Sequence, residues 1–88
     1  MIPIDTLWDL LSEHQNEPFY TVKKLPFSYI IKGGELFVDR RTKSITKATF
    51  QQALDRIAKN PDKVIGPKSL NVFGAPYIWA LLKAFEIV

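Results

Sequence analysis

The feature that most constrains the fold is a pair of adjacent glycines, Gly33 and Gly34, between two strand-prone runs. The run FSYIIK comes before the pair and the run ELFVDR follows it, and both contain β-branched and aromatic residues. Because glycine accepts positive φ without a steric penalty, such a pair is typical of a tight antiparallel hairpin. The sequence therefore predicts paired strands over 27–39, with positive φ at Gly33, Gly34 or both.

A third β-prone run, FYTVKK at 19–24, precedes this hairpin and is separated from it by Pro26. A proline beside a strand favours a turn or a sheet edge, because it has no N–H to donate. We therefore expect residues 19–39 to form a three-stranded antiparallel meander. The stretch 43–45 adds a brief strand or leads directly into the next helix.

The segment 47–59 carries the most complete helical signals in the chain. Thr46 stands at the N-cap position, and Ile45 and Phe50 have the spacing of a hydrophobic staple. Apolar residues then recur at intervals of three and four, which predicts that Phe50 and Leu54 are buried against the sheet. Asn60-Pro61 ends the helix.

Two further segments, 4–15 and 75–85, also show helical periodicity. The predicted fold is a single α+β domain over residues 1–88, with the element order α-β-β-β-α-α. In it, the three-stranded antiparallel meander packs against the 47–59 and 75–85 helices, and the N-terminal helix lies beside them. A chain of 88 residues is the usual length of one domain.

Residues suited to catalysis or metal binding are few. The chain has no cysteine and one histidine, His14, whereas a zinc site needs three or four ligands. Neither Asp9 nor Ser12 has the helical spacing that would aim it at the His14 ring in a catalytic triad. GPKS at 66–69 lacks the first glycine of a phosphate loop, so it predicts a turn. We therefore predict a non-enzymatic protein with no catalytic residue, no metal site and no cofactor.

Charge is unevenly distributed along the chain, although the net charge is only +3. Residues 1–17 hold four acids and no Lys or Arg, whereas residues 18–60 hold nine cations and three acids. This asymmetry indicates an anionic partner or a docking face. The seven candidate nucleic-acid-binding residues are Arg40, Arg41, Lys43, Lys47, Lys23, Lys24 and Lys32.

These cations suit phosphate oxygens, with help from the N–H groups that begin the 47–59 helix. Tyr20, Tyr29 and Phe37 would stack on bases if they face outward. The leading hypothesis is thus a small binding module for nucleic acid, with DNA or RNA left open. The alternative is a solvated turn whose neighbouring aromatic residues form the core.

The 75–85 helix is apolar on almost every side. Aromatic residues with few charges are typical of interface cores, so this helix is a candidate surface for a homodimer or another protein. The candidate interface residues are Tyr77, Trp79, Leu82 and Phe85. The alternative is that the helix fills the core of its own domain.

The sequence also favours a cytoplasmic protein without a membrane span. The N-terminal segment carries acids and no basic region, unlike a secretory signal. The most apolar run, 72–88, is interrupted by Lys83 and Glu86 and does not predict a membrane helix. The absence of cysteine agrees with a cytoplasmic location.

Two stretches carry a resemblance to known sequences: PFYTVKKLPFSYIIKGGELFVDRRTKSITKATFQQAL and GPKSLNVFGAPYIWALL. Together they resemble a group of short bacterial proteins of unknown function, over roughly residues 18–82. The resemblance implies a compact bacterial cytoplasmic domain. It implies no activity.

Overall fold

The Gly33-Gly34 turn joins two antiparallel strands, as the sequence predicts. In the computed structural model, which describes residues 2–88, β3 (Tyr29–Lys32) pairs with β4 (Glu35–Val38) in the register Lys32↔Glu35. Gly33 has a φ of +61°, and Gly34 is not in the positive region. A single positive φ at the first central residue is the requirement of a type II′ hairpin turn.

The third strand of this sheet is β5 (Ile45–Thr46), and the expectation that the 19–24 run supplies it was wrong. The antiparallel meander itself is confirmed, in the order β3-β4-β5. Only β1 (Phe19–Tyr20) of that run is a strand, and it pairs with β2 (Pro26–Phe27) in a separate ladder.

The reason lies at the free edge of β3, which is already occupied. The Gln15 side-chain oxygen accepts a hydrogen bond from the Ile31 N–H at 2.7 Å. The Asn16 N–H donates to the Tyr29 carbonyl oxygen at 2.9 Å. Because the segment after the first helix takes these edge groups, residues 19–24 cannot pair there, and the chain instead folds back on itself through a turn at 21–25.

The three predicted helices are present as α1 (Ile4–Glu13), α2 (Lys47–Lys59) and α4 (Ala75–Ala84). A fourth, α3 (Pro67–Leu70), lies in the segment expected to be a linker. Thr46 caps α2, since its hydroxyl oxygen accepts from the Thr49 N–H at 3.2 Å. The small α+β domain that the sequence predicts is thus confirmed. None of these helices in residues 2–88 is long and apolar enough to cross a bilayer.

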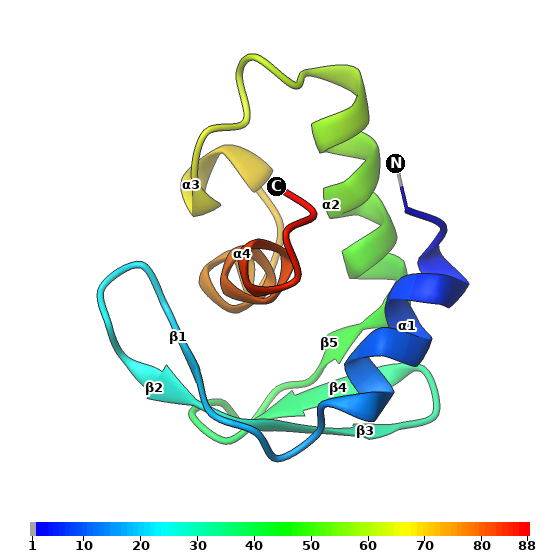
Figure 1. Cartoon of the computed structure of the whole chain (residues 1–88), viewed down its shortest axis with the longest axis vertical. Coiled ribbons are helices and arrows are strands. Elements are labelled where there is room, and N and C mark those ends of the chain that lie inside the picture. The colour runs from blue at the N-terminus through cyan, green and yellow to red at the C-terminus, as the bar shows by residue number, and fades with distance from the viewer. Residues whose placement is uncertain (1) are drawn as a thin grey trace.

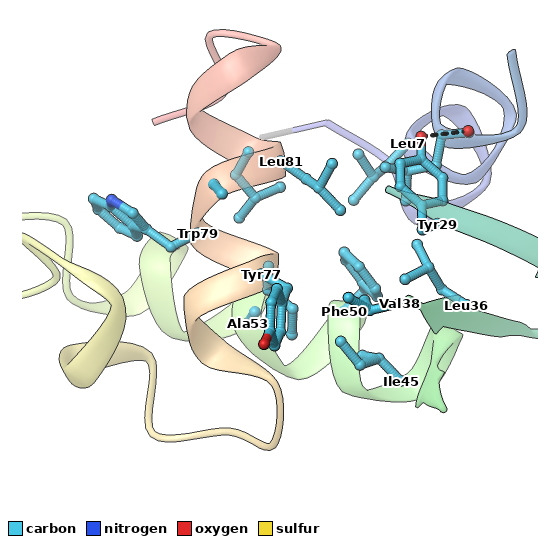
Figure 2. Packing of buried hydrophobic residues seen from close by; sticks show 14 of the residues in the cluster. Leu7, Tyr29, Leu36, Val38, Ile45, Phe50, Ala53, Tyr77, Trp79 and Leu81 are labelled. Atoms are coloured by element: carbon cyan, nitrogen blue, oxygen red, sulfur yellow. Dashed lines mark hydrogen bonds between the residues drawn. The ribbon is translucent and has the colours of Figure 1, made fainter. Parts of the chain in front are cut away.

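Helix α4 occupies the centre of the molecule and is seen end-on in Figure 1, with the other elements around it. Its residues from Tyr77 to Leu82 are all buried, which explains why the helix is apolar on every side. Phe50 and Leu54 of α2 are also buried in this core, as predicted. Figure 2 shows α2, α4 and the sheet contributing side chains to one cluster.

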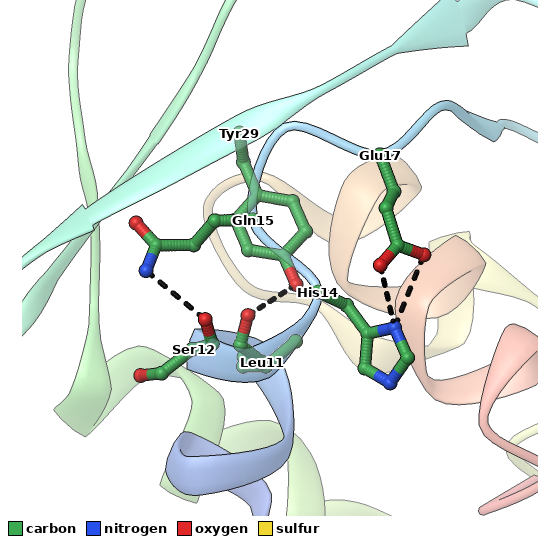
Figure 3. A network of polar contacts seen from close by, with 6 residues as sticks. All are labelled: Leu11, Ser12, His14, Gln15, Glu17 and Tyr29. Carbon is green, nitrogen blue, oxygen red and sulfur yellow. Dashed lines mark hydrogen bonds and ion pairs between the residues drawn. The ribbon is translucent and has the colours of Figure 1, made fainter.

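Polar contacts from the middle and the end of helix α1 hold it to the sheet. In its middle, the Trp8 indole N–H donates to the Gly33 carbonyl oxygen at 3.0 Å. Near its end, the buried Tyr29 hydroxyl donates to the Leu11 carbonyl oxygen at 2.6 Å (Figure 3). The Lys47 N–H, at the start of α2, donates to Gly34 at 2.9 Å. The glycine turn therefore connects α1 and α2 to the sheet through hydrogen bonds.

Candidate docking groove

The structure divides the seven predicted cations into two groups. Lys32 and Lys47 lie at the glycine turn, where the Lys47 ammonium pairs with Asp5 of α1 at 2.7 Å. The other five lie toward the opposite end of the β3-β4 hairpin, in the 21–25 turn and the loop between β4 and β5: Lys23, Lys24, Arg40, Arg41 and Lys43. The seven cations therefore gather in two places, and the second holds five of them.

The loop between β4 and β5 is held over the start of α4. The Arg41 guanidinium lies 5.9 Å from the centre of the Phe73 ring and 5.7 Å from that of Tyr77. The Lys43 ammonium lies 4.8 Å from the Phe73 ring centre. Cations at these distances are attracted to aromatic faces. The contacts thus join a loop that follows β4 to residues thirty or more positions later in the chain.

Gly74 makes this arrangement possible. It begins α4 with a φ of +73°, a conformation that side-chain-bearing residues rarely adopt. A Cβ at this position would lie 2.8 Å from Ile45 Cγ1 and closer still to Cδ1. The missing side chain therefore lets the start of α4 approach β5, and this approach places Phe73 and Tyr77 beside Arg41.

A hollow of about 640 Å³ opens next to these residues, between the 21–25 turn, the 65–69 segment and the start of α4. Its walls are mainly apolar and include Leu25, Pro67 and Tyr77. Three cations line it: Lys23, Arg41 and Lys68.

A second hollow, of about 710 Å³, lies on the other side of the 21–25 turn. Tyr20 and Trp79 line it together with two cations, Lys24 and Lys83. Both hollows share Thr21, Val22 and Ile65. We call the two hollows and the residues between them the groove face. Of the described residues, no Asp or Glu lines either hollow.

The groove face also gathers exposed apolar side chains. Ile65 is 83% exposed, Val22 62% and Tyr20 59%, and Leu25 is exposed as well. Scattered exposed apolar residues are ordinary, but a contiguous group ringed by polar residues marks an interaction site. The combination of exposed apolar groups and unopposed positive charge therefore makes this face the candidate functional site.

The residues predicted as a partner interface on α4 are largely internal. Leu82 is fully buried, and Phe85 is half-buried against the rings of Phe19 and His14. Tyr77 and Trp79 keep only 8% exposure each, at the floors of the two hollows. Of the two alternatives stated for this helix, filling the domain's own core is the one that the structure shows.

Of the three aromatic residues proposed to stack on bases, one is turned away from solvent. Tyr29 is buried and hydrogen-bonded to α1, so it does not meet the condition of facing outward. Phe37 is half-buried, and the centre of its ring lies 5.9 Å from the Lys32 ammonium. Tyr20 is exposed and borders the second hollow. Tyr29 is buried because its side chain lies on the face of the sheet that packs against the core.

The polar contacts at the end of α1 form a structural network (Figure 3). Nδ1 of His14 lies 2.9 Å from the Glu17 carboxylate, while the Ser12 hydroxyl donates to the Trp8 carbonyl oxygen of its own helix. Burial, with a smaller contribution from Glu17, raises the pKa of the Tyr29 phenol above its usual value. Within residues 2–88, no three His, Cys, Asp or Glu side chains are grouped closely enough to hold a metal ion.

The GPKS segment forms the start of α3, and its N–H groups are used internally. The Ser69 hydroxyl oxygen accepts from the N–H groups of Ile65 and Gly66, at 3.1 and 3.2 Å. The Ser69 carbonyl oxygen accepts from the Arg56 guanidinium at 3.1 Å, which ties α3 to α2. The segment thus presents Ile65 and Lys68 to the groove face.

Ile65, Lys68, Phe73 and Lys83 were not among the sequence-predicted nucleic-acid or partner residues. They lie far along the chain from the Lys23 turn, and no local pattern connects them to it. One weak signal exists: Ile65 is a large apolar residue in a turn-rich segment without a helical or strand period.

Comparisons with protein-family models, with curated proteins and with solved structures give no match for this chain. The resemblance to short bacterial proteins therefore stays a prediction. The class of protein that the fold and the groove face define is a small α+β domain with an apolar, cation-lined groove.

Proposed function

We propose that the protein is a small non-enzymatic binding module of the bacterial cytoplasm that holds an anionic macromolecule on its groove face. One observation carries the proposal: five cations and no described carboxylate line the two adjoining hollows. Asp5, Asp9 and Glu13 lie on α1, which is on the opposite side of the view in Figure 1 from α3 and the β1-β2 turn.

The groove cations have no carboxylate partner among the described residues. Within residues 2–88, the two ion pairs are His14–Glu17 and Lys47–Asp5, and neither involves a cation of the groove face. Cations over an apolar surface of low dielectric constant raise the local concentration of anions and speed their association. The face thus combines long-range attraction with a contact surface.

Single-stranded nucleic acid is one candidate partner, favoured by a specific observation. Arg41 and Lys43 lie beside Phe73, whose ring is 38% exposed, and Tyr20 is exposed nearby on the groove face. Cations that track phosphates next to aromatic rings are the common elements of such sites. Self-association, the other function considered from the sequence, would need a surface other than the buried face of α4.

Fluorescence anisotropy tests the proposal with two labelled polyanions, poly-L-glutamate and oligo(dT), each of about 20 units and measured at low salt because screening weakens exposed charge pairs. We expect at least one to bind, with affinity that falls as salt rises. Lys23→Glu with Lys68→Glu should weaken binding on the order of tenfold, since each exposed charge pair contributes up to about 1 kcal/mol.

The matched control is Lys32→Glu with Lys63→Glu, which makes the same change in net charge at lysines that line neither hollow. At about 0.1 M salt, this control should weaken binding by less than about twofold, because screening there limits the reach of exposed charges to about 10 Å. Equal losses in both variants, or no binding of either polyanion, would refute the proposal.

A further inference from the structure

We infer that the groove face takes the apolar side of an acidic amphipathic helix from a partner protein. The inference rests on the proposed function and names its partner class. It is argued from the lining of the hollows, from their arrangement and from the charge at their rims.

The lining of the first hollow suits apolar side chains better than bases. Val22, Leu25, Ile65 and Pro67 offer neither a ring to stack on nor a side-chain hydrogen-bonding group, and Tyr77 is nearly buried. The Phe73 ring already faces Arg41 and Lys43. Leucine, isoleucine or phenylalanine side chains of a partner would bury against such walls with a gain from the hydrophobic effect.

The arrangement suits a helix. Two hollows adjoin along a shared border that contains Thr21, Val22 and Ile65. An amphipathic helix presents apolar side chains at positions i, i+3, i+4 and i+7 along one face. Successive turns of such a helix can place one anchor in each hollow, with the exposed Ile65 and Val22 side chains packed between them.

The charges select an acidic helix. Lys23, Arg41 and Lys68 border the first hollow, and Lys24 and Lys83 border the second. Asp and Glu residues beside the apolar stripe of the partner would meet these cations at the solvent-exposed rim. Charge complementarity of this kind raises the association rate and excludes basic partners.

A second copy of the chain does not supply this helix. Helix α1 is acidic and amphipathic, but its apolar residues Leu7, Trp8 and Leu11 are buried in its own core. Presenting them to another molecule would require α1 to leave the fold. The occupant is therefore a different protein.

Three labelled peptides test the inference against the folded chain by anisotropy. The first is an acidic amphipathic helix of about 16 residues, with leucines at i, i+3, i+4 and i+7 and glutamates elsewhere. The second has the same composition in an order that spreads the leucines over all sides, and the third is poly-L-glutamate. We expect the first to bind with a dissociation constant of roughly tens of micromolar, and the others on the order of tenfold more weakly.

Apolar variants separate the groove from general charge attraction. Val22→Ser with Ile65→Ser should weaken binding of the amphipathic peptide by roughly tenfold and leave binding of poly-L-glutamate nearly unchanged. The reason is that only the amphipathic peptide buries apolar groups. Ile30→Ser is the control, since Ile30 is also exposed and apolar but lines neither hollow. Circular dichroism of each variant verifies that the fold is intact.

The outcomes are distinguishable. Equal binding of the amphipathic and reordered peptides overturns the inference, and so does tighter binding of oligo(dT) through the same groove residues. In both cases the anion-binding function stands. If none of the peptides and neither polyanion binds, the proposed function and the inference fail together.

Discussion

Substitution of Gly74 tests the contact that assembles the groove face. Gly74→Ala forces a side-chain-bearing residue to adopt a φ of +73°, which costs about 1–2 kcal/mol. The new Cβ would also meet Cγ1 and Cδ1 of Ile45, a residue that is 1% exposed and has little room to move. Overpacking of this kind costs about 1–3 kcal/mol. The expected total loss of unfolding free energy is therefore about 2–5 kcal/mol.

The two turn glycines give matched controls for this value. Gly33→Ala meets the same conformational penalty at φ +61° but no atom within 4 Å, so it should lose only about 1–2 kcal/mol. Gly34→Ala meets neither the conformational penalty nor a close contact, and should change stability by less than about 0.5 kcal/mol. The difference between Gly74→Ala and Gly33→Ala isolates the contact with Ile45.

Urea unfolding followed by tryptophan fluorescence is a suitable assay, because Trp8 and Trp79 are both buried. At an m value of about 1 kcal/mol/M, the difference between the two variants corresponds to about 1–3 M in the midpoint. In an Ile45→Ala background, the cost of Gly74→Ala should approach that of Gly33→Ala, with a coupling of about 1–3 kcal/mol. Equal losses for Gly74→Ala and Gly33→Ala in the wild-type background would refute the close approach.

Three further predictions concern the core, the cap and pH. Phe50→Ala removes a fully buried ring whose centre lies 5.5 Å from that of Trp8, and should lose about 3–5 kcal/mol in urea unfolding; a loss below about 1 kcal/mol would contradict its placement. Thr46→Ala should lose about 1 kcal/mol and Thr46→Gly only a few tenths, so equal losses would argue against the cap. Because burial raises the pKa of Tyr29, its proton stays on the folded chain at a pH where the unfolded chain loses it. Its contribution to stability is therefore full below about pH 10 and falls above it by up to about 1.4 kcal/mol per pH unit. The unfolding free energy of Tyr29→Phe should lack this pH dependence. If the unfolding free energies of the wild type and the variant fell in parallel above about pH 10, the role of Tyr29 would be refuted.

Much of the secondary structure was predictable because its signals are local. The glycine pair specifies a tight turn whatever surrounds it, and the cap of α2 at Thr46 needs only the residues next to it. The all-round apolar character of α4 likewise indicates burial before any contact is known. Each of these inferences depends on residues a few positions apart, where the backbone geometry itself fixes which groups meet.

The candidate site was only partly predictable. The sequence identified Lys23, Lys24 and Arg41 as cations and Tyr77 and Trp79 as aromatic contact residues, but assigned the two sets to alternative functions. The structure places members of both sets around the same hollows.

The sequence by itself determined the hairpin, the capped helix and the buried final helix, while the tertiary structure decided the sheet membership and the groove face. The 19–24 run is kept out of the three-stranded sheet because Gln15 and Asn16 occupy the β3 edge. The groove face joins segments that lie up to 66 positions apart in the chain, and no local pattern relates them. They meet because α4 must bury every side at once, and because Gly74 lets its first turn come close to Ile45.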